Sequence, residues 1–397
     1  MQFAKRIEAL RANVFADMDR AKATARGSGK TIIDLSLGSS DLPASEAVIE
    51  AIASSLKDTS THGYLLFHGT RGFREAVATW YSNRYGVAVN PETEVLPLIG
   101  SQEGTAHLPL AILNPGDFAL LLDPGYPSHA GGVYLAGGQI YPMPLLAEND
   151  FLPIFEEIPP SVLEQSKMMV LSYPHNPTTA IAPLSFFQKA VDFCRKQNLV
   201  LVHDFPYGDI VFTENSDKNA IAPSILQADP NKEVSIEFFT FSKSYNMGGF
   251  RIGFAIGNPK LIAALKRIKA VVDFNQYQGI LNGAVAALNC DSAIVQDTVK
   301  TFEKRRDVFV QALQNIGWNV PTPSATMYIW AKLPEAWQDK SVQFCIKLVQ
   351  ATWIAVSPGF GFGKFGEGYV RFALVQEPAV LEKAVEKIAE FLHTPSS

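Results

Sequence analysis

The sequence is poor in cysteine. Only three cysteines occur among 397 residues, Cys194, Cys290 and Cys345, and they lie far apart without the paired spacing of a zinc site. A disulfide framework and a structural metal site are therefore not expected, and the chain suits a reducing compartment. We predict a protein that binds no metal.

The sequence also lacks a surplus of either charge. It has 34 lysines and arginines against 39 aspartates and glutamates, and hydrophobic residues make up 47% of the chain. This is the composition of a globular protein, without the basic excess that binding to nucleic acid or an anionic membrane requires. We expect a small-molecule substrate and neither a nucleic-acid nor a membrane partner.

Long hydrophobic runs are missing as well. No apolar run reaches the roughly 18 residues that a membrane-spanning helix needs. Residues 1–20 alternate charged and apolar side chains and do not form the uninterrupted apolar core of a signal peptide. We therefore predict a cytoplasmic protein, and its length is sufficient for more than one domain.

Strand-like and helix-like segments alternate through the first two thirds of the chain. Strands are expected at 95–99, 118–122, 139–143, 168–172, 199–204 and 234–239, and a further apolar run covers 250–256. This alternation predicts an α/β fold with a mostly parallel sheet covered by helices on both faces, because parallel strands need crossover connections. Ligands of such sheets bind beyond the carboxyl ends of the strands.

The C-terminal part predicts a second, smaller domain. Helices are expected at 259–272 and 296–316, then strands at 318–320, 327–332, 355–357 and 370–374 and a closing helix at 378–392. An amphipathic helix over 3–22 is expected to pack with this part. We therefore predict a large domain of residues 45–285 and a discontinuous small domain of residues 1–44 and 286–397.

One stretch, residues 239–253 with the sequence FTFSKSYNMGGFRIG, carries the strongest chemical signal. Its Lys243 lies between apolar runs, and a buried ammonium is costly unless it is paired, neutralised or used covalently. Lysine amines form Schiff bases with aldehydes, and pyridoxal 5'-phosphate (PLP) is the cofactor held in this way. The alternative is a lysine at a strand end whose amine reaches solvent.

Several residues could hold the phosphate of such a cofactor. Thr240, Ser242 and Arg251 supply two hydroxyls and a planar cation. The turn GSQEG at 100–104 follows a predicted strand and opens a helix, whose free N–H groups form an anion seat. An ordinary glycine-serine turn is the alternative there.

Other polar and aromatic residues follow the predicted strands. Asp204 could keep a pyridine nitrogen protonated, or it could cap the next turn. Asn176, between two prolines, and Tyr207 could hydrogen-bond the ring's phenolic oxygen, although Asn-Pro is also a common turn. Tyr126 could stack on a flat ring or be a core residue. Arg371, in an apolar strand, needs an anion, for which a substrate carboxylate is the natural choice.

Together these motifs resemble the fold-type I PLP enzymes, specifically the class I/II aminotransferases related to aspartate aminotransferase, over nearly the whole chain. The resemblance rests on SKSYNMGGFRIG at 242–253, NPT at 176–178, the pairing of Asp204 with Tyr207, and Arg371, which occur in the family's order. Residues 96–101 and 361–371 are most similar to the LL-diaminopimelate aminotransferase-like branch.

The resemblance implies a seven-stranded, mostly parallel sheet sandwiched by helices, plus a smaller α/β domain. It implies that Lys243 is the Schiff-base lysine and the base and acid of the proton shift. The other implied cofactor contacts are Asp204 at the pyridine nitrogen, Asn176 and Tyr207 at the ring oxygen, Tyr126 on the ring, and Ser101, Gln102, Thr240, Ser242 and Arg251 at the phosphate.

The resemblance also implies the substrate contacts and the assembly. Gly38, Asn176 and Arg371 would bind the substrate, and Tyr64 would reach the phosphate of the neighbouring subunit, which makes the protein a homodimer with shared sites. The predicted activity is transfer of an α-amino group from an amino acid to a 2-oxo acid, in amino-acid biosynthesis. A β- or γ-lyase or a synthase on the same fold, and a non-catalytic PLP-binding regulatory module, stay open as alternatives, as does the identity of the substrate.

Overall fold

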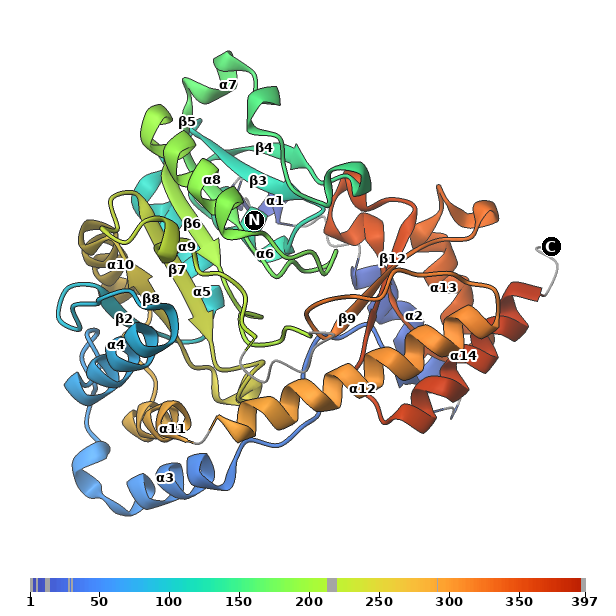
Figure 1. Cartoon of the computed structure of the whole chain (residues 1–397), viewed down its shortest axis with the longest axis horizontal. Coiled ribbons are helices and arrows are strands. Elements are labelled where there is room, and N and C mark those ends of the chain that lie inside the picture. The colour runs from blue at the N-terminus through green and yellow to red at the C-terminus, as the bar shows by residue number, and fades with distance from the viewer. Residues whose placement is uncertain are drawn as a thin grey trace.

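The computed structural model describes residues 3–4, 6–10, 15–27, 29, 31–212, 220–290 and 292–393, which form a larger body with one sheet and a smaller body with two (Figure 1). The larger sheet has seven strands in the order β2-β8-β7-β6-β5-β3-β4. Their bounds are β2 (Val95–Leu98), β3 (Phe118–Asp123), β4 (Gln139–Pro144), β5 (Ser166–Leu171), β6 (Val200–Asp204), β7 (Ser235–Thr240) and β8 (Gly253–Gly257). Only β8 runs antiparallel to its neighbours. The predicted mostly parallel, seven-stranded α/β fold is confirmed.

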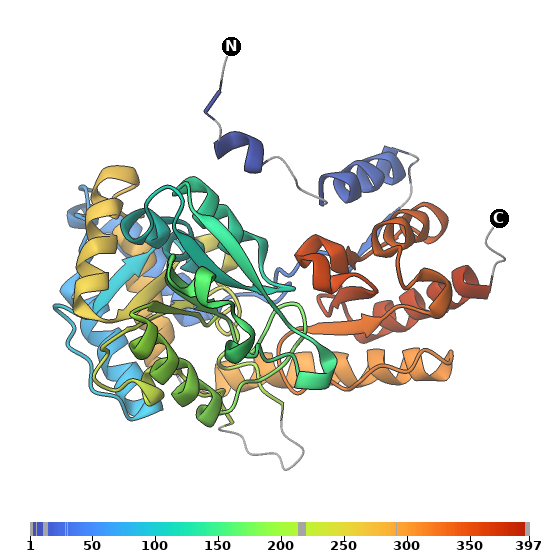
Figure 2. The same ribbon diagram turned by 90° about the horizontal axis from the view of Figure 1, so that it is seen from above.

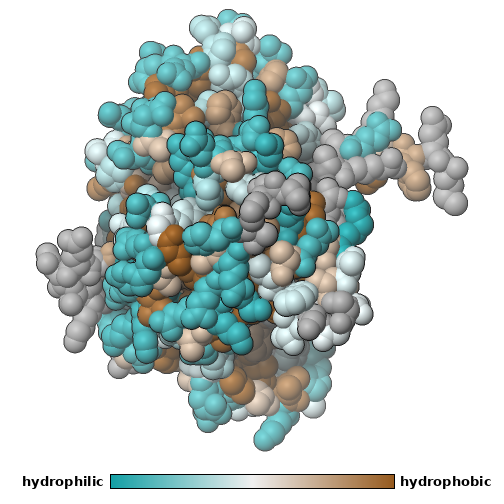
Figure 3. Space-filling view, turned by 90° about the vertical axis from the view of Figure 1, so that its right-hand side faces the viewer, coloured by the Kyte–Doolittle hydropathy of each residue, from teal (hydrophilic) through white to brown (hydrophobic). Residues whose placement is uncertain are grey.

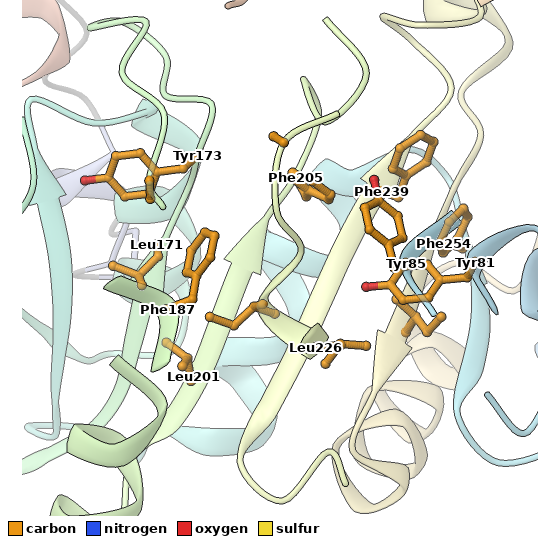
Figure 4. Packing of buried hydrophobic residues seen from close by; sticks show 14 of the residues in the cluster. Tyr81, Tyr85, Leu171, Tyr173, Phe187, Leu201, Phe205, Leu226, Phe239 and Phe254 are labelled. Atoms are coloured by element: carbon orange, nitrogen blue, oxygen red, sulfur yellow. The ribbon is translucent and has the colours of Figure 1, made fainter. Parts of the chain in front are cut away.

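Helices cover both faces of this sheet because its strands bury both sets of their side chains. Neighbouring residues in β7 show this: Phe238 packs in one apolar cluster and Phe239 in the other. The cluster that contains Phe239 is drawn in Figure 4. The helices of this body are α3 (Glu46–Lys57), α4 (Arg71–Tyr85), α5 (Ser101–Ile112), α6 (Pro127–Leu135), α7 (Pro160–Leu163), α8 (Leu184–Gln197), α9 (Ile225–Ala228), α10 (Pro259–Val272) and α11 (Gln278–Asn289).

Local signals set the helix ends. The side chain of Thr70 caps α4 by accepting a hydrogen bond of 3.2 Å from the N–H of Phe73. At the other end, Gly86 adopts a left-handed conformation with φ of 69°. α10 begins with Asn258 as its cap and Pro259 in its first turn, so it starts and ends where the sequence predicts.

The smaller body contains a three-stranded antiparallel sheet in the order β11-β12-β9 and a separate parallel pair, β1 with β10. The strands are β1 (Ile33–Asp34), β9 (Tyr328–Lys332), β10 (Ile354–Ala355), β11 (Ser357–Pro358) and β12 (Tyr369–Ala373). Three helices of the C-terminal part pack around them: α12 (Ala293–Asn315), α13 (Ser341–Thr352) and α14 (Pro378–His393). α12 is the long orange helix that runs from one body to the other in Figure 1.

Two predicted strands of the smaller body need correction. Residues 318–320 form no strand, because the backbone N–H of Trp318 donates to the carbonyl of Leu313 at 3.0 Å, and Pro321 and Pro323 cannot donate to a ladder. The predicted strand at 355–357 is divided between β10 and β11, which belong to different sheets.

The predicted N-terminal helix over 3–22 is also different in the structure. The described residues form α1 (Arg6–Ala9) and α2 (Phe15–Gly27), while residues 5 and 11–14 of the predicted helix lie outside the described part. α1 lies against α6 of the larger body and α2 against α13 of the smaller one (Figure 2). Short 3-10 helices occur at Thr59–Thr61, Ala147–Asn149, Phe155–Glu157, Gly248–Phe250, Glu335–Trp337, Gly359–Phe362 and Lys364–Gly366.

The outer face of the smaller body is mainly hydrophilic, with hydrophobic residues scattered over it (Figure 3). α14 shows why: Leu381, Val385 and Ile388 recur at helical spacing and are buried, which leaves its other side to polar residues. Within the described residues, every helix is too short or too polar to cross a lipid bilayer.

Candidate active site

The carboxyl ends of β5, β6 and β7 lie side by side and bring three predicted residues together. Asn176 follows β5, Asp204 ends β6 and Lys243 follows β7, and these strands pair in parallel register. The residues face a cavity of about 460 Å³. The predicted site residues that line it are Gly38, Ser101, Gln102, Tyr126, Asn176, Asp204, Tyr207, Thr240, Ser242, Lys243, Arg251 and Arg371.

Lys243 lies in the turn between β7 and the 3-10 helix Gly248–Phe250. Its Nζ donates a hydrogen bond to the carbonyl of Gly38 and lies 5.7 Å from the centre of the Tyr207 ring. Burial lowers the pKa of the Lys243 amine and Arg371 lowers it further, although Tyr328 opposes the shift. A lysine with a lowered pKa is more readily neutral, and a neutral amine can act as a nucleophile or a base.

Asp204 is a buried carboxylate with one oxygen engaged. Its Oδ2 lies 3.0 Å from Nε2 of His129, which is itself buried in the first turn of α6. Its Oδ1 is buried and has no hydrogen-bond partner. A buried carboxylate oxygen requires a donor, so the structure leaves room there for a protonated ring nitrogen.

An anion seat lies at the start of α5. Gly100, with φ of 73°, precedes the helix, and a side chain there would collide with Arg251, whose Nη2 would be 2.5 Å from the added carbon. The guanidinium is therefore held against the turn that exposes the first N–H groups of the helix. The hydroxyls of Thr240 and Ser242, 2.8 Å apart, line the same cavity.

Arg371 points from β12 into the cavity between two aromatic rings. Its guanidinium lies 4.2 Å from the centre of the Tyr328 ring and 4.7 Å from that of Phe362. It donates to Asn176 Oδ1 and to the Ser36 carbonyl, both at 2.7 Å, while its Nε is buried without a partner. Within the described part of the chain no carboxylate pairs with it, so its charge and free donors suit an incoming anion.

Tyr328 is a site residue that the sequence did not predict. Its hydroxyl lies 2.8 Å from that of Tyr207, and a side chain at Gly38 would meet it at 1.8 Å. Burial alone would raise the pKa of Tyr328, but Arg371 and Lys243, with a hydrogen bond from Tyr207, lower it below its ordinary value. The pKa of Tyr207 is raised by burial and by Tyr328, and either hydroxyl can donate in the bond between them.

His129 is the second residue that sequence reasoning missed. Its ring also contacts Tyr126, with ring centres 5.8 Å apart in an edge-to-face arrangement. Tyr126, which precedes α6 and lines the cavity, is 36% exposed and is therefore not the core tyrosine of the alternative interpretation. The position of His129, in the first turn of a helix that follows a strand end, was the only signal in the sequence.

Tyr64 is not brought into the cavity of its own chain. It is 96% exposed, and its ring centre lies 6.2 Å from that of Phe274. Leu66 and Val271 are also exposed, at 62% and 87%. A large tyrosine exposed to this degree beside other exposed apolar residues suits a contact with another molecule.

The cavity fits PLP. Its volume lies within the range of roughly 300–1,000 Å³ that small-ligand pockets occupy, at about 460 Å³. A lysine of lowered pKa, a buried carboxylate oxygen that lacks a donor, and an arginine beside a helix start face the same space. These groups match an aldehyde, a protonated pyridine and a phosphate ester, in that order.

Comparison with known proteins gives consistent matches over the full chain. The family described as Aminotransferase class I and II matches residues 30–388. The LL-diaminopimelate aminotransferase of Dehalococcoides mccartyi (strain ATCC BAA-2266 / KCTC 15142 / 195) is 43% identical over 392 residues, which are 98% of this chain and 99% of that protein.

Solved structures agree with these matches. A structure described as substrate-bound BacF from Bacillus subtilis has a TM-score of 0.93 and 35% identity, covering 98% of each chain. A probable N-succinyldiaminopimelate aminotransferase from Thermus thermophilus has a TM-score of 0.89 and 42% identity, over 95% of this chain and 99% of that one.

Proposed function

Because the chain belongs to the aminotransferase class I and II family and is a PLP-dependent transaminase, we propose roles for individual residues of its cavity, a substrate and an assembly. When bound, PLP supplies an aldehyde carbon that takes up an amino group and a ring that withdraws electrons from the substrate's Cα. The roles below are those that the chain's own residues play toward these groups.

Lys243 would hold the cofactor's aldehyde carbon through Nζ, and its free amine would take and return the proton of the substrate's Cα. The lowered pKa of its amine supports this role, because a neutral amine is required to accept a proton. Asp204 keeps the ring nitrogen protonated through Oδ1, while His129 holds the other carboxylate oxygen. The aromatic face of Tyr126 supports the ring.

The remaining cofactor contacts follow from the anion seat and the strand ends. We assign the phosphate to the first N–H groups of α5 with Ser101 and Gln102, together with Thr240, Ser242 and Arg251. The ring oxygen is assigned to Asn176 and Tyr207. Since the hydroxyl of Tyr207 is already bonded to that of Tyr328, its assignment requires it to exchange that partner or to bond both groups.

We assign the substrate's α-carboxylate to Arg371, and the absence of a charged partner for Arg371 within the described residues is the observation that carries the function. Its guanidinium is fixed in plane by two rings and has only neutral partners, so a carboxylate adds the missing counter-charge. Asn176 fixes one end of the guanidinium, and Gly38, which has no side chain, lets the hydroxyl of Tyr328 lie close to the backbone beside it. Holding the carboxylate this way orients the Cα of the substrate toward Lys243.

The central test is a substitution at Lys243. Lys243→Ala should abolish both the near-visible absorbance of lysine-bound PLP and the amino transfer. An alanine variant that retains full activity without that band would contradict the proposal. To separate transamination from the lyase alternative, the enzyme is incubated with an amino acid and no oxo acid: transamination converts one equivalent of cofactor, whereas continuous ammonia release indicates a lyase.

We propose a diaminopimelate-type amino acid as the substrate. The support is the relative named LL-diaminopimelate aminotransferase, which shares 43% identity over 98% of this chain. The test compares the loss of the near-visible band on addition of LL-diaminopimelate with the loss on addition of aspartate, glutamate or phenylalanine. A response to one of these three but not to LL-diaminopimelate would reject this substrate while leaving the transaminase intact.

We also propose a division into a large domain of residues 45–285 and a discontinuous small domain of residues 1–44 with 286–397.

We propose a homodimer in which Tyr64 of each subunit reaches the partner's phosphate site. The support for the homodimer is the exposure of Tyr64, whose ring contacts that of the exposed Phe274. Complementation tests the shared site, because a mixed dimer of Tyr64→Ala and Lys243→Ala subunits contains one intact site. Equal mixing after reversible dissociation should restore about a quarter of wild-type activity, and no recovery from verified mixed dimers would reject the shared site.

A further inference from the structure

A fully buried polar network lies on the face of the sheet opposite Asp204. Consecutive residues of a strand point to opposite faces, so His203 points away from the cavity when Asp204 lines it. His203 is directly paired across the sheet with Glu237 of β7, and both are 0% exposed. The proposed chemistry uses neither side chain, although a buried polar pair of this kind is costly to keep.

The carboxylate of Glu237 has four hydrogen-bonding partners in the described structure. It accepts hydrogen bonds from Tyr81 Oη at 2.6 Å, from Ser224 Oγ at 3.0 Å and from the N–H of Ile225 at 3.1 Å. Burial and the carboxylate raise the pKa of Tyr81 well above its ordinary value, so its hydroxyl stays protonated and donates. The remaining contact, 2.9 Å long, joins Oε2 to Nδ1 of His203. Glu237 therefore fixes the plane and position of the imidazole ring.

The other nitrogen of His203 is engaged with the backbone at the end of β5. Its Nε2 lies 3.3 Å from the N–H nitrogen and 3.1 Å from the carbonyl oxygen of Tyr173. A neutral Nε2 accepts from that N–H, and a protonated one donates to that carbonyl. In either state the ring holds the backbone of Tyr173, so the contact does not depend on the charge of His203.

Tyr173, which His203 contacts, lies three residues before Asn176, and Asn176 in turn contacts Arg371, the proposed substrate-binding arginine. Tyr173, His175 and Asn176 are all buried, and Asn176 Oδ1 accepts from Arg371 at 2.7 Å. The segment that contains these residues also has backbone bonds of 2.8 Å from the N–H of His175 to the carbonyl of Ala180 and from the N–H of Thr179 to the carbonyl of His175. Figure 4 shows Tyr81 and Tyr173 on opposite sides of the cluster, with the strands of the sheet between them.

We propose that His203, held by Glu237, is a positioning residue that sets the place of Asn176 relative to Asp204 and Lys243. The network joins the middle of β7, through Glu237, to the ends of β6 and β5, and each of these strands is followed by or ends in one of the three residues. The inference rests on the proposed role of Asn176 at the cofactor and at Arg371. It assigns a function to buried groups that otherwise only add the cost of burial.

Two amide variants of His203 separate the two contacts of its ring. Asparagine places its amide nitrogen near the position of Nδ1 and can keep the bond to Glu237 while losing that to Tyr173. Glutamine reaches the position of Nε2 and can keep the bond to Tyr173. Hydrogen–deuterium exchange of the peptide that contains Tyr173, and the dissociation constant of PLP, are measured on both holoenzymes and on the cofactor-free proteins.

His203→Asn should speed exchange of the Tyr173 amide about tenfold and weaken PLP binding by a similar factor, as expected for loss of one buried hydrogen bond. His203→Gln should stay near wild type in both. Tyr81→Phe is the structural control: it removes a bond to Glu237 and should lower the melting temperature without changing Tyr173 exchange. Glu237→Gln, which weakens the ring's anchor, should change exchange in the same direction as His203→Asn and serves if that variant does not fold.

Equal exchange in the asparagine and glutamine variants, whether fast or slow, would overturn the proposal. So would faster exchange in Tyr81→Phe, because the network would then act through stability alone. Neither outcome depends on turnover. A wild-type protein without the near-visible band of bound PLP would instead count against the proposed function, and exchange in the cofactor-free protein would still decide the role of His203.

Discussion

An alanine at position 38 tests how closely the substrate side of the cavity is packed. A methyl carbon there would lie 1.8 Å from the hydroxyl oxygen of Tyr328, and 2.7 and 2.9 Å from two ring carbons. Contact between such atoms needs about 3.5 Å, so the phenol would have to retreat by roughly 1.7 Å. It is not a free side-chain end, because Tyr207 bonds its hydroxyl at 2.8 Å and Arg371 lies on its ring.

The retreat would break the bond to Tyr207 and shift the guanidinium that Tyr328 supports. A displacement of about 1 Å at a substrate-positioning group can cost about 100-fold in rate, and we expect kcat/KM of Gly38→Ala to fall by about that factor. Overpacking should lower the free energy of unfolding by about 1–3 kcal/mol. Steady-state kinetics and urea titration measure the two effects, and PLP absorbance should persist because the phosphate seat is untouched.

Two further variants check this reasoning. Gly249→Ala is the matched control, since an added methyl there meets nothing within 4 Å, and it should behave as wild type. Removing the hydroxyl in Gly38→Ala/Tyr328→Phe relieves the shortest contact and should recover about tenfold over the single variant, because the remaining overlap is smaller. A Gly38→Ala enzyme whose kcat/KM stays within about twofold of wild type would refute the steric argument.

Three other predictions concern buried charges. Lys269→Met should lower the free energy of unfolding by about 3–5 kcal/mol, since both oxygens of buried Glu103 lie 2.9 Å from Lys269 Nζ. The double variant Lys269→Met/Glu103→Gln should recover much of this loss in urea titrations. A Lys269→Met variant as stable as wild type would contradict the prediction. The pKa of Lys243 lies below the unfolded value of 10.5, so the unfolded chain binds more protons and the free energy of unfolding rises as pH increases toward 10.5. In the cofactor-free protein, Lys243→Met should therefore be more stable than wild type at neutral pH, by a margin that shrinks as pH rises. A margin that stays constant with pH would count against the lowered pKa. Burial lowers the pKa of His175 from 6.5 to about 3, so NMR should show no titration of its imidazole between these two pH values. The free energy of unfolding should fall as pH drops through the same interval, because only the unfolded chain takes up the proton there. A titration midpoint near 6.5 would be inconsistent with the burial of His175.

The sequence was most informative where residues follow strands. Asn176, Asp204 and Lys243 each come after an apolar run, and because parallel strands end at one edge of a sheet, their meeting could be predicted. Arg371 could be predicted because a cation in an apolar strand requires an anion. The helix α13, which was not among the predicted elements, carries Phe344 at helical spacing from Leu348, so its signal was present.

The residues that were missed depend on relations between elements. Tyr328 contacts Arg371 only because β9 and β12 pair so that Arg371 is opposite Trp330, which places Tyr328 on the diagonal. Strand register across an antiparallel sheet is not set by either strand alone. The bond of His129 to Asp204 likewise requires the orientation of α6 under the sheet edge, which a strand-to-helix turn does not specify.

The position of the Arg371 guanidinium between the rings of Tyr328 and Phe362 has a practical consequence for handling the enzyme. Its polar partners, the amide of Asn176, the carbonyl of Ser36 and the hydroxyl of Ser357, carry no charge, so none of them neutralises the positive charge of the guanidinium. Small oxyanions such as sulfate should therefore bind to the guanidinium of Arg371 and compete with the substrate's carboxylate. The apparent KM will depend on which counter-ion the buffer contains, and kinetic work on this protein needs a bulky or weakly coordinating anion.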